Sequence, residues 1–168
     1  QQIDKIIEEL EPALAAGVGI IDVGAESTRP GAKALNSTQE IKRLEPLLVV
    51  LNQLKSCYSF KLSLDSFRAE TLLHFLPYLD IVNDVSGKLD SDCLRQIKDA
   101  GKSYAFMHSL TIPANPQIVL DANCDPCVEI LQWAESKLEQ LLSLGFTHNQ
   151  LICDPGIGFN KTTAQSWY

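Results

Sequence analysis

Short apolar runs rich in β-branched residues alternate along the chain with longer segments in which apolar residues recur every three or four positions. The runs cover residues 18–23, 61–64, 81–85, 104–107 and 151–153. They are nearly continuous in apolar residues rather than alternating with polar ones, which is typical of parallel strands covered on both faces. The pattern therefore predicts five parallel strands.

Two helices are predicted around the first of these strands. Before it, apolar residues fall on one helix face that ends at Gly17, a residue suited to a C-terminal cap: Ile3, Ile6, Ile7, Leu10 and Leu14. After it, Ser37 and Glu40 have the spacing of a capping box, and apolar residues follow at helical intervals up to Leu51. Pro46 removes an amide donor inside this second segment, which predicts a kink or a restart there.

Three further helices are predicted within residues 72–76, 94–97 and 128–142, ending at Pro77, near Gly101 and at Gly145. The chain stops at Trp167 and Tyr168 in what looks like the start of another helix. This alternation of strands and helices predicts an α/β architecture with right-handed crossovers. The two candidates are a doubly wound open sheet and a (β/α)₈ barrel.

Each predicted strand ends in polar or functional-looking residues: Asp22, Asp65, Asn83, Met107 with His108, and Asp154. Both candidate architectures build their sites at the carboxyl ends of parallel strands. Five contributing strands favour a barrel mouth over a single crevice. Because a barrel typically needs about 250 residues, we expect an incomplete (β/α)₈ TIM barrel, with residues 1–168 as a single partial domain.

Composition places the chain among globular proteins, with 45% apolar and 21% charged residues in a length of 168. The formal charge of −7 argues against a surface built for nucleic acid or anionic lipid, because both need clustered cations. No run approaches the roughly 20 apolar residues that cross a bilayer, and the polar start does not resemble a signal peptide. We therefore expect a cytoplasmic protein with no nucleic-acid or membrane partner.

The five cysteines are scattered and odd in number, so reduced thiols are expected. Cys124 and Cys127 form a CxxC pair, but no second pair or nearby histidine supports a zinc site, and we interpret them as helix-start residues. Asp84 and Asp90 are interpreted as helix caps, a common role for acids in strand-to-helix loops.

A segment rich in hydrogen-bond donors, residues 24–32, follows the first predicted strand. It contains two hydroxyl groups and the guanidinium of Arg29, and so predicts a loop that presents donors to an anion, with a plain turn beside a surface arginine as the alternative. Asp65, Asn83 and Asp154 would converge on one cavity and offer two carboxylates and an amide. That set suits a heterocycle whose edge carries adjacent N–H groups. Lys161 is either a cation of this site or a solvated lysine.

Five segments in order resemble the dihydropteroate synthase family. Residues 22–32, Asp-Val-Gly-Ala-Glu-Ser-Thr-Arg-Pro-Gly-Ala, are similar to its second signature, with Ala25 where glycine is more usual. The others are Ser63-Leu64-Asp65-Ser66, residues 81–87 (Ile-Val-Asn-Asp-Val-Ser-Gly), Phe106-Met107-His108, and residues 154–159 (Asp-Pro-Gly-Ile-Gly-Phe). The resemblance covers essentially the whole chain, and the Ser-Thr-Arg-Pro-Gly-Ala stretch is its most distinctive part.

The resemblance implies a (β/α)₈ barrel represented here by strands two to six, with the first strand and the last two absent. It implies an enzyme that condenses p-aminobenzoate with 6-hydroxymethyl-7,8-dihydropterin diphosphate, assisted by Mg²⁺ whose usual protein ligand lies outside this chain, in a homodimer when full length. The implied pterin-binding residues are Asp65, Asn83, Met107, Asp154 and Gly158. Thr28, Pro30 and Phe159 would contact p-aminobenzoate, Thr28 and Arg29 would be catalytic, and Lys161 would make an anion or loop contact.

Two other functions stay open from the sequence. A pterin-binding methyltransferase of the same barrel class would share the pterin-binding acids, but residues 27–32 argue against it. A noncatalytic pterin-binding fragment would have lost the diphosphate-binding residues, and the 168-residue segment alone is expected to be inactive.

Overall fold

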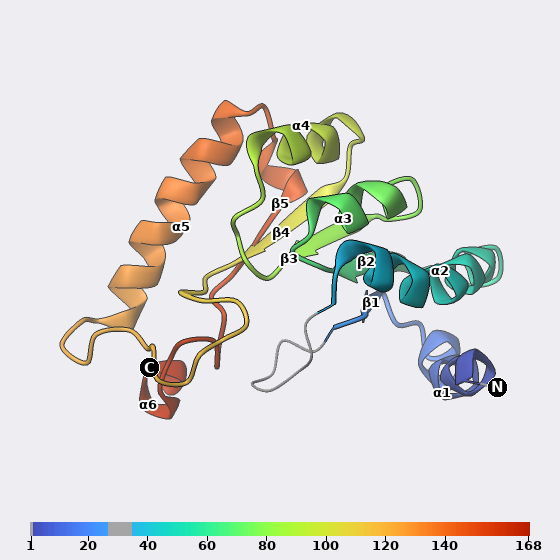
Figure 1. Ribbon diagram of the computed structural model, residues 1–168, viewed down its shortest axis with the longest axis horizontal. Coiled ribbons are helices and arrows are strands. Elements are labelled where there is room, and N and C mark those ends of the chain that lie inside the picture. Colours follow the sequence, from blue (N-terminus) through green and yellow to red (C-terminus); the bar gives the residue numbers. More distant parts are fainter. Residues whose placement is uncertain (1, 27–34) are drawn as a thin grey trace.

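The computed structural model describes residues 2–26 and 35–168 and contains one parallel five-stranded sheet (Figure 1). Its strands are β1 (Ile20–Gly24), β2 (Lys61–Asp65), β3 (Ile81–Asp84), β4 (Ser103–Met107) and β5 (Leu151–Asp154). They are hydrogen-bonded in the order β1-β2-β3-β4-β5, all parallel. The five predicted strands are confirmed, each within two residues of its expected bounds.

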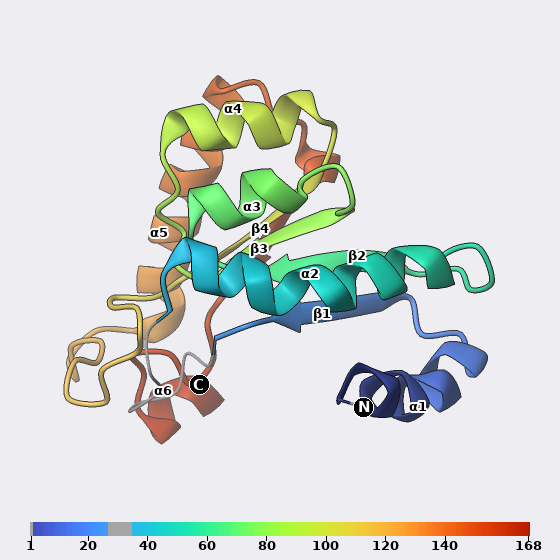
Figure 2. The same cartoon turned by 45° about the vertical axis from the view of Figure 1, so that its right-hand side comes forward.

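The helices connect successive strands, and each predicted helix is present. They are α1 (Gln2–Ala15), α2 (Ser37–Leu54), α3 (Ala69–Phe75), α4 (Ser91–Asp99), α5 (Pro126–Ser143), the 3₁₀ turn η1 (His148–Gln150) and α6 (Thr163–Trp167). Helices α2, α3 and α4 lie side by side along one face of the sheet in both views (Figures 1 and 2). Sequential strand order with helices on one face is the winding of a barrel wall, whereas a doubly wound sheet reverses its order. The fold is therefore part of a (β/α)₈ barrel.

The core lies between the sheet and this helical layer. Leu62, Leu64 and Val82 are completely buried against one face, and α2 to α5 supply the opposing side chains. Helical residues with zero exposure include Leu51, Leu72, Leu94, Ile97 and Leu141. Packing of these amphipathic helices, rather than helix propensity, fixes the sheet that carries the polar strand ends.

Helix α2 begins and continues differently from the sequence prediction. The N-cap is Asn36, whose side chain accepts from the Gln39 amide at 2.9 Å while Gln39 reaches back to the Asn36 amide, so the expected Ser37–Glu40 capping box is wrong by one residue. The restart at Pro46 is also wrong, because α2 runs unbroken from residue 37 to 54. Pro46 is exposed, so water can satisfy the carbonyl group that its missing amide leaves free.

Asp90 caps α4 as predicted, accepting from the amides of Asp92 and Cys93. Asp84 is not a helix cap, and that interpretation is corrected. Its buried carboxylate accepts from the Tyr104 hydroxyl at 2.7 Å and from the Ser86 amide at 2.9 Å. The low dielectric of the core makes these partners obligatory, and they fix the turn after β3.

All five cysteines are free thiols, and Cys127 lies in the first turn of α5, at the helix start that the sequence suggested. None of the helices in the described part of the chain is both long and apolar enough to cross a membrane.

Candidate functional site

The face of the sheet turned away from the helical layer carries the polar strand-end residues. Side chains alternate between the two faces of each strand, and residues paired in register share a face. Asp65 pairs with Asn83, and Asn83 with Ala105. Two residues farther along, Met107 pairs with Asp154. The register therefore brings together four residues that the sequence assigned to one site: Asp65, Asn83, Met107 and Asp154.

Asp22 joins this group through a direct contact that the sequence interpretation did not assign. The Asn83 side-chain amide donates to the Asp22 carboxylate at 3.2 Å, across 61 residues of sequence. Asp22 lies on β1 two residues before Gly24, which pairs with Asp65, so alternation places it on the same face. Asp22 could be recognised in the sequence as a polar strand end, but no local pattern pointed to its contact with Asn83.

The electrostatics of the site centre on Asp65. Burial, first of all, and then the neighbouring carboxylates together raise the pKa of Asp65 to about 7; in order of importance these carboxylates belong to Asp22, Glu40, Asp84 and Glu26. The group therefore titrates near neutral pH. An ionised Asp65 is an acceptor for N–H donors, and a protonated one carries a donor of its own.

The raised pKa of Asp65 predicts a cost in stability. The folded pKa of about 7 lies above the ordinary aspartate value of 3.8, so ionisation opposes folding progressively as the pH rises from about 4 to 7, and the full penalty is present at pH 8. We expect Asp65→Asn to be more stable than the wild type at pH 8 by roughly 1 to 2 kcal/mol after allowing for solvent screening. Thermal unfolding should show this gain at pH 8 and little difference near pH 4. Equal unfolding temperatures of Asp65→Asn and the wild type at both pH values would contradict the raised pKa of Asp65.

The loop after β5 begins with a tight turn against the end of β4. The Asp154 carboxylate accepts the Gly156 amide at 2.7 Å, and the His108 amide donates to the Asp154 carbonyl at 2.9 Å. Gly156 is buried with φ +68° and packs against Met107 and His108. Beyond it, Gly158 is exposed and Phe159 is half-buried. Asp154 and Met107 are thus held at fixed positions by main-chain contacts.

Lys161 anchors this loop from within. Its ammonium group donates to the carbonyls of Gly156 at 2.9 Å and Phe159 at 3.0 Å and lies 3.1 Å from Nδ1 of His108. Burial lowers the pKa of Lys161, while Asp154 acts in the opposite direction. The interpretation as a solvated helix-start lysine is wrong, because the residue is buried and makes loop contacts.

Asn160 makes a second set of loop contacts, which the sequence did not predict. It adopts φ 52°, and its side-chain oxygen accepts from the Leu110 amide at 3.1 Å and the Thr111 amide at 3.0 Å. Asparagine tolerates the left-handed region better than most side chains, and this tolerance is the only local feature of the sequence that could have pointed to Asn160. These contacts tie the loop after β4 to the loop that carries Phe159.

Thr28, Arg29 and Pro30, the predicted catalytic and p-aminobenzoate residues, lie outside the described residues. Among residues 2–26 and 35–168, no group of three His, Cys, Asp or Glu side chains converges as metal ligands.

Known proteins are similar to this chain over nearly its whole length. The profile of a family described as "Pterin binding enzyme" matches residues 1–168. The chain is 38% identical over 162 residues to the folate synthesis bifunctional protein of Chlamydia muridarum, covering 93% of this chain and 36% of that protein. It is 30% identical over 166 residues to the dihydropteroate synthase of Streptococcus pyogenes, covering 98% of this chain and 58% of that enzyme. The chain spans about a third of the bifunctional relatives that it matches.

A solved structure shares the fold over nearly the whole chain. The crystal structure of dihydropteroate synthase from Anaplasma phagocytophilum with bound 6-hydroxymethylpterin-monophosphate superposes with a TM-score of 0.90 at 28% identity. The superposition covers 99% of this chain and 66% of that one. The sheet described above therefore corresponds to part of a larger pterin-binding barrel.

Proposed function

The chain belongs to the family of pterin-binding enzymes, and from that membership we propose that its parent protein is a dihydropteroate synthase. The observation that carries the proposal is the polar row on one sheet face, where Asp65 and Asn83 are register neighbours beside Asp22. The relatives named dihydropteroate synthase support the same reaction class.

In the proposed reaction the aniline nitrogen of p-aminobenzoate attacks the methylene carbon of the pterin diphosphate. A C–N bond forms, the C–O bond to diphosphate breaks, and the nitrogen loses one proton. Asp65 and Asp154 accept hydrogen bonds from the N–H groups of the pterin edge, and Asn83 both donates and accepts. Met107 packs against the ring. Binding and orientation by preorganised groups lower the barrier, so no protein nucleophile is required.

Several parts of the proposal rest on the sequence resemblance alone. Thr28 and Arg29 are proposed as catalytic, with Thr28, Pro30 and Phe159 at p-aminobenzoate and Gly158 at the pterin. Mg²⁺ would be held by substrate phosphates and by groups outside this chain. A homodimer and a cytoplasmic location complete the proposal, the latter supported by five free thiols.

The test is dihydropteroate formation by the full-length protein that carries this chain. We expect turnover that requires both p-aminobenzoate and the pterin diphosphate. Chromatography would detect the dihydropteroate formed, and a second assay would measure the diphosphate released. Omission of either substrate is the control. Methyl transfer from a methylated pterin without any use of p-aminobenzoate would overturn the proposal in favour of a methyltransferase. Tight pterin binding with no turnover of either kind would leave a noncatalytic pterin-binding protein.

A further inference from the structure

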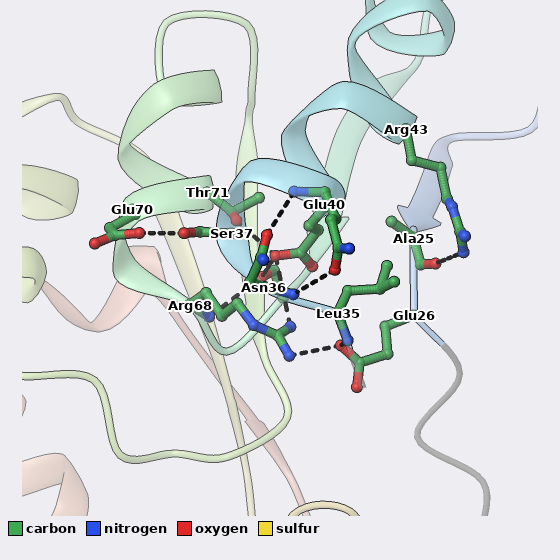
Figure 3. Close-up of polar contacts among 12 residues, drawn as sticks. Ala25, Glu26, Leu35, Asn36, Ser37, Glu40, Arg43, Arg68, Glu70 and Thr71 are labelled. Carbon is green, nitrogen blue, oxygen red and sulfur yellow. Dashed lines mark hydrogen bonds and ion pairs between the residues drawn. The ribbon is translucent and has the colours of Figure 1, made fainter. Parts of the chain in front are cut away.

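A buried carboxylate on α2 contacts the loop that follows β2. Glu40 is 1% exposed, and its carboxylate accepts from the Ser66 hydroxyl at 3.1 Å and from the Thr71 hydroxyl at 2.5 Å. Nη1 of Arg68 lies 3.6 Å from the same carboxylate (Figure 3). A buried carboxylate is strongly unfavourable unless a charge and hydrogen bonds compensate it. These three partners therefore allow Glu40 to be buried and tie α2 to the loop after β2 and to α3.

Ser66 connects Glu40 to two residues of the candidate site. Ser66 directly follows Asp65, and its amide donates to the Asn83 carbonyl at 3.2 Å. Its hydroxyl, besides donating to Glu40, accepts the Arg68 amide at 3.2 Å and so closes the turn after β2. Ser66 is only 2% exposed, so water competes little for these bonds. A shift of Ser66 would therefore disturb the ends of β2 and β3 together.

Glu40 and the candidate site lie on opposite faces of the sheet. Asp65 points away from the helical layer, and side chains alternate along the strand, so the side chain of Ser66 points toward that layer. There it contacts Glu40 of α2. Glu40 can therefore act on Asp65 through Ser66, while a ligand bound on the other face of the sheet stays out of its reach.

We propose that Glu40 is a positioning residue that, through Ser66, fixes Asp65 and Asn83 in their pterin-binding arrangement without touching the pterin. The inference rests on the proposed function for the identity of the ligand. The path from Glu40 to the two site residues rests on hydrogen bonds alone. Without the Glu40 carboxylate, the buried hydroxyls of Ser66 and Thr71 would lose their acceptor, and the turn after β2 would loosen.

Glu40 also acts on Asp65 through its charge. Burial is the largest cause of the raised pKa of Asp65, and four carboxylates follow in the order Asp22, Glu40, Asp84 and Glu26. The cation beside two of these acids is Arg68, which pairs with Glu26 and Glu40. Removing the negative charge of Glu40 should therefore lower the pKa of Asp65, whereas removing only the Ser66 hydroxyl should not.

The main experiment measures the Kd for pterin diphosphate by calorimetry in the full-length protein and its variants. Glu40→Met and Ser66→Ala remove the hydrogen bond between the two residues, and each should raise the Kd at pH 8 by roughly three- to tenfold, because a displaced acceptor binds its ligand less well. Glu40→Gln keeps an oxygen that can accept from both hydroxyls, so it should raise the Kd less than Glu40→Met. Glu45→Gln is the matched control, at an exposed glutamate of the same helix, and should leave the Kd unchanged.

The pH dependence separates positioning from a general loss of structure. Wild-type affinity should rise with a midpoint near the Asp65 pKa of about 7. Glu40→Gln should move this midpoint down by roughly half a pH unit or more, because a neighbouring negative charge is gone. Ser66→Ala keeps that charge and should keep the midpoint. An unchanged midpoint in Glu40→Gln would overturn the proposal, because Glu40 would then not act on Asp65.

A double variant tests whether Glu40 and Ser66 act through one contact. Glu40→Met/Ser66→Ala should bind pterin diphosphate no worse than Glu40→Met, since both changes remove the same hydrogen bond. Losses that multiply in the double variant would overturn the path through Ser66. If Glu40→Met does not fold, Glu40→Gln and Ser66→Ala still test the proposal, because the first keeps the shape of the side chain and the second removes a single oxygen atom.

Amide exchange at Ser66 separates this inference from the proposed function. The Ser66 amide donates to the Asn83 carbonyl, so a loosened turn in Glu40→Met should speed its exchange, and Glu45→Gln should not. If the wild type makes dihydropteroate and both Glu40→Met and Ser66→Ala bind pterin diphosphate normally, the positioning role fails while the function stands. If the wild type makes none, the proposed function fails, and unchanged exchange at Ser66 would overturn the positioning role independently.

Discussion

Replacing Asp65 by alanine in the full-length protein is expected to weaken pterin diphosphate binding by roughly 10- to 150-fold at pH 8. That range corresponds to about 1.5 to 3 kcal/mol, the usual contribution of a hydrogen bond to a charged group. Asp65 lies beside Asn83 in register and faces the same side of the sheet as Asp22. Its removal deletes an acceptor and leaves ligand N–H groups without a partner. Calorimetric titration with the pterin diphosphate measures the change.

The pH dependence gives this prediction its control. With a pKa of about 7, Asp65 is mostly protonated at pH 6 and mostly ionised at pH 8. Wild-type affinity should therefore rise over this interval, because the ionised form accepts from the ligand. Asp65→Asn should remove the rise, and Asp99→Ala, at an exposed acid at the end of α4, should leave it unchanged. Undiminished binding by Asp65→Ala would remove Asp65 from the pterin site.

The sheet was predictable because its signals are local. Each strand is a short run bounded by helical segments, and glycines with positive φ end the intervening helices at Gly17, Gly101 and Gly145. Strand order followed from the alternation of strands and helices and from the polar residue at each strand end. The predicted capping box at Ser37 and Glu40 was wrong, although its spacing is correct, because the Glu40 side chain contacts a residue distant in sequence instead of the helix start. Asn36 caps the helix, and Glu40 serves the buried ion pair with Arg68.

The site was predictable only in part, because its remaining contacts join residues far apart in the chain. Asp65 and Asn83 were found as strand ends, and the register brought them together. The partner of Asp22 is 61 residues away, and the acceptors and donors of Asn160 lie more than 40 residues away. No local pattern distinguishes such a residue from an ordinary polar one. The ion pairs of Arg68 were hidden for the same reason, since Glu26 and Glu40 belong to the preceding βα unit.

Gly156→Ala is expected to cause the largest loss of stability among single substitutions at the site. Gly156 has φ +68°, and an added Cβ would lie 2.1 Å from the His108 carbonyl oxygen and 3.1 Å from Cγ of Met107. The first contact is with main chain, which cannot rotate away as a side chain can. Relief would require moving the end of β4 or the turn after β5, which hold Met107 and Asp154. We expect a loss of roughly 4 kcal/mol or more, the range that marks severe packing or backbone defects.

Gly158→Ala separates the steric part of this effect from the backbone part. Gly158 also has positive φ, at +81°, but an added Cβ would meet nothing within 4 Å. Its substitution should therefore cost only about 1 kcal/mol, the ordinary penalty for a side chain in the left-handed region. Urea unfolding of the two variants against the wild type measures the difference directly. Similar losses for both would mean that the contact between Gly156 and the His108 carbonyl does not constrain the loop, and that Asp154 and Met107 are held by other contacts.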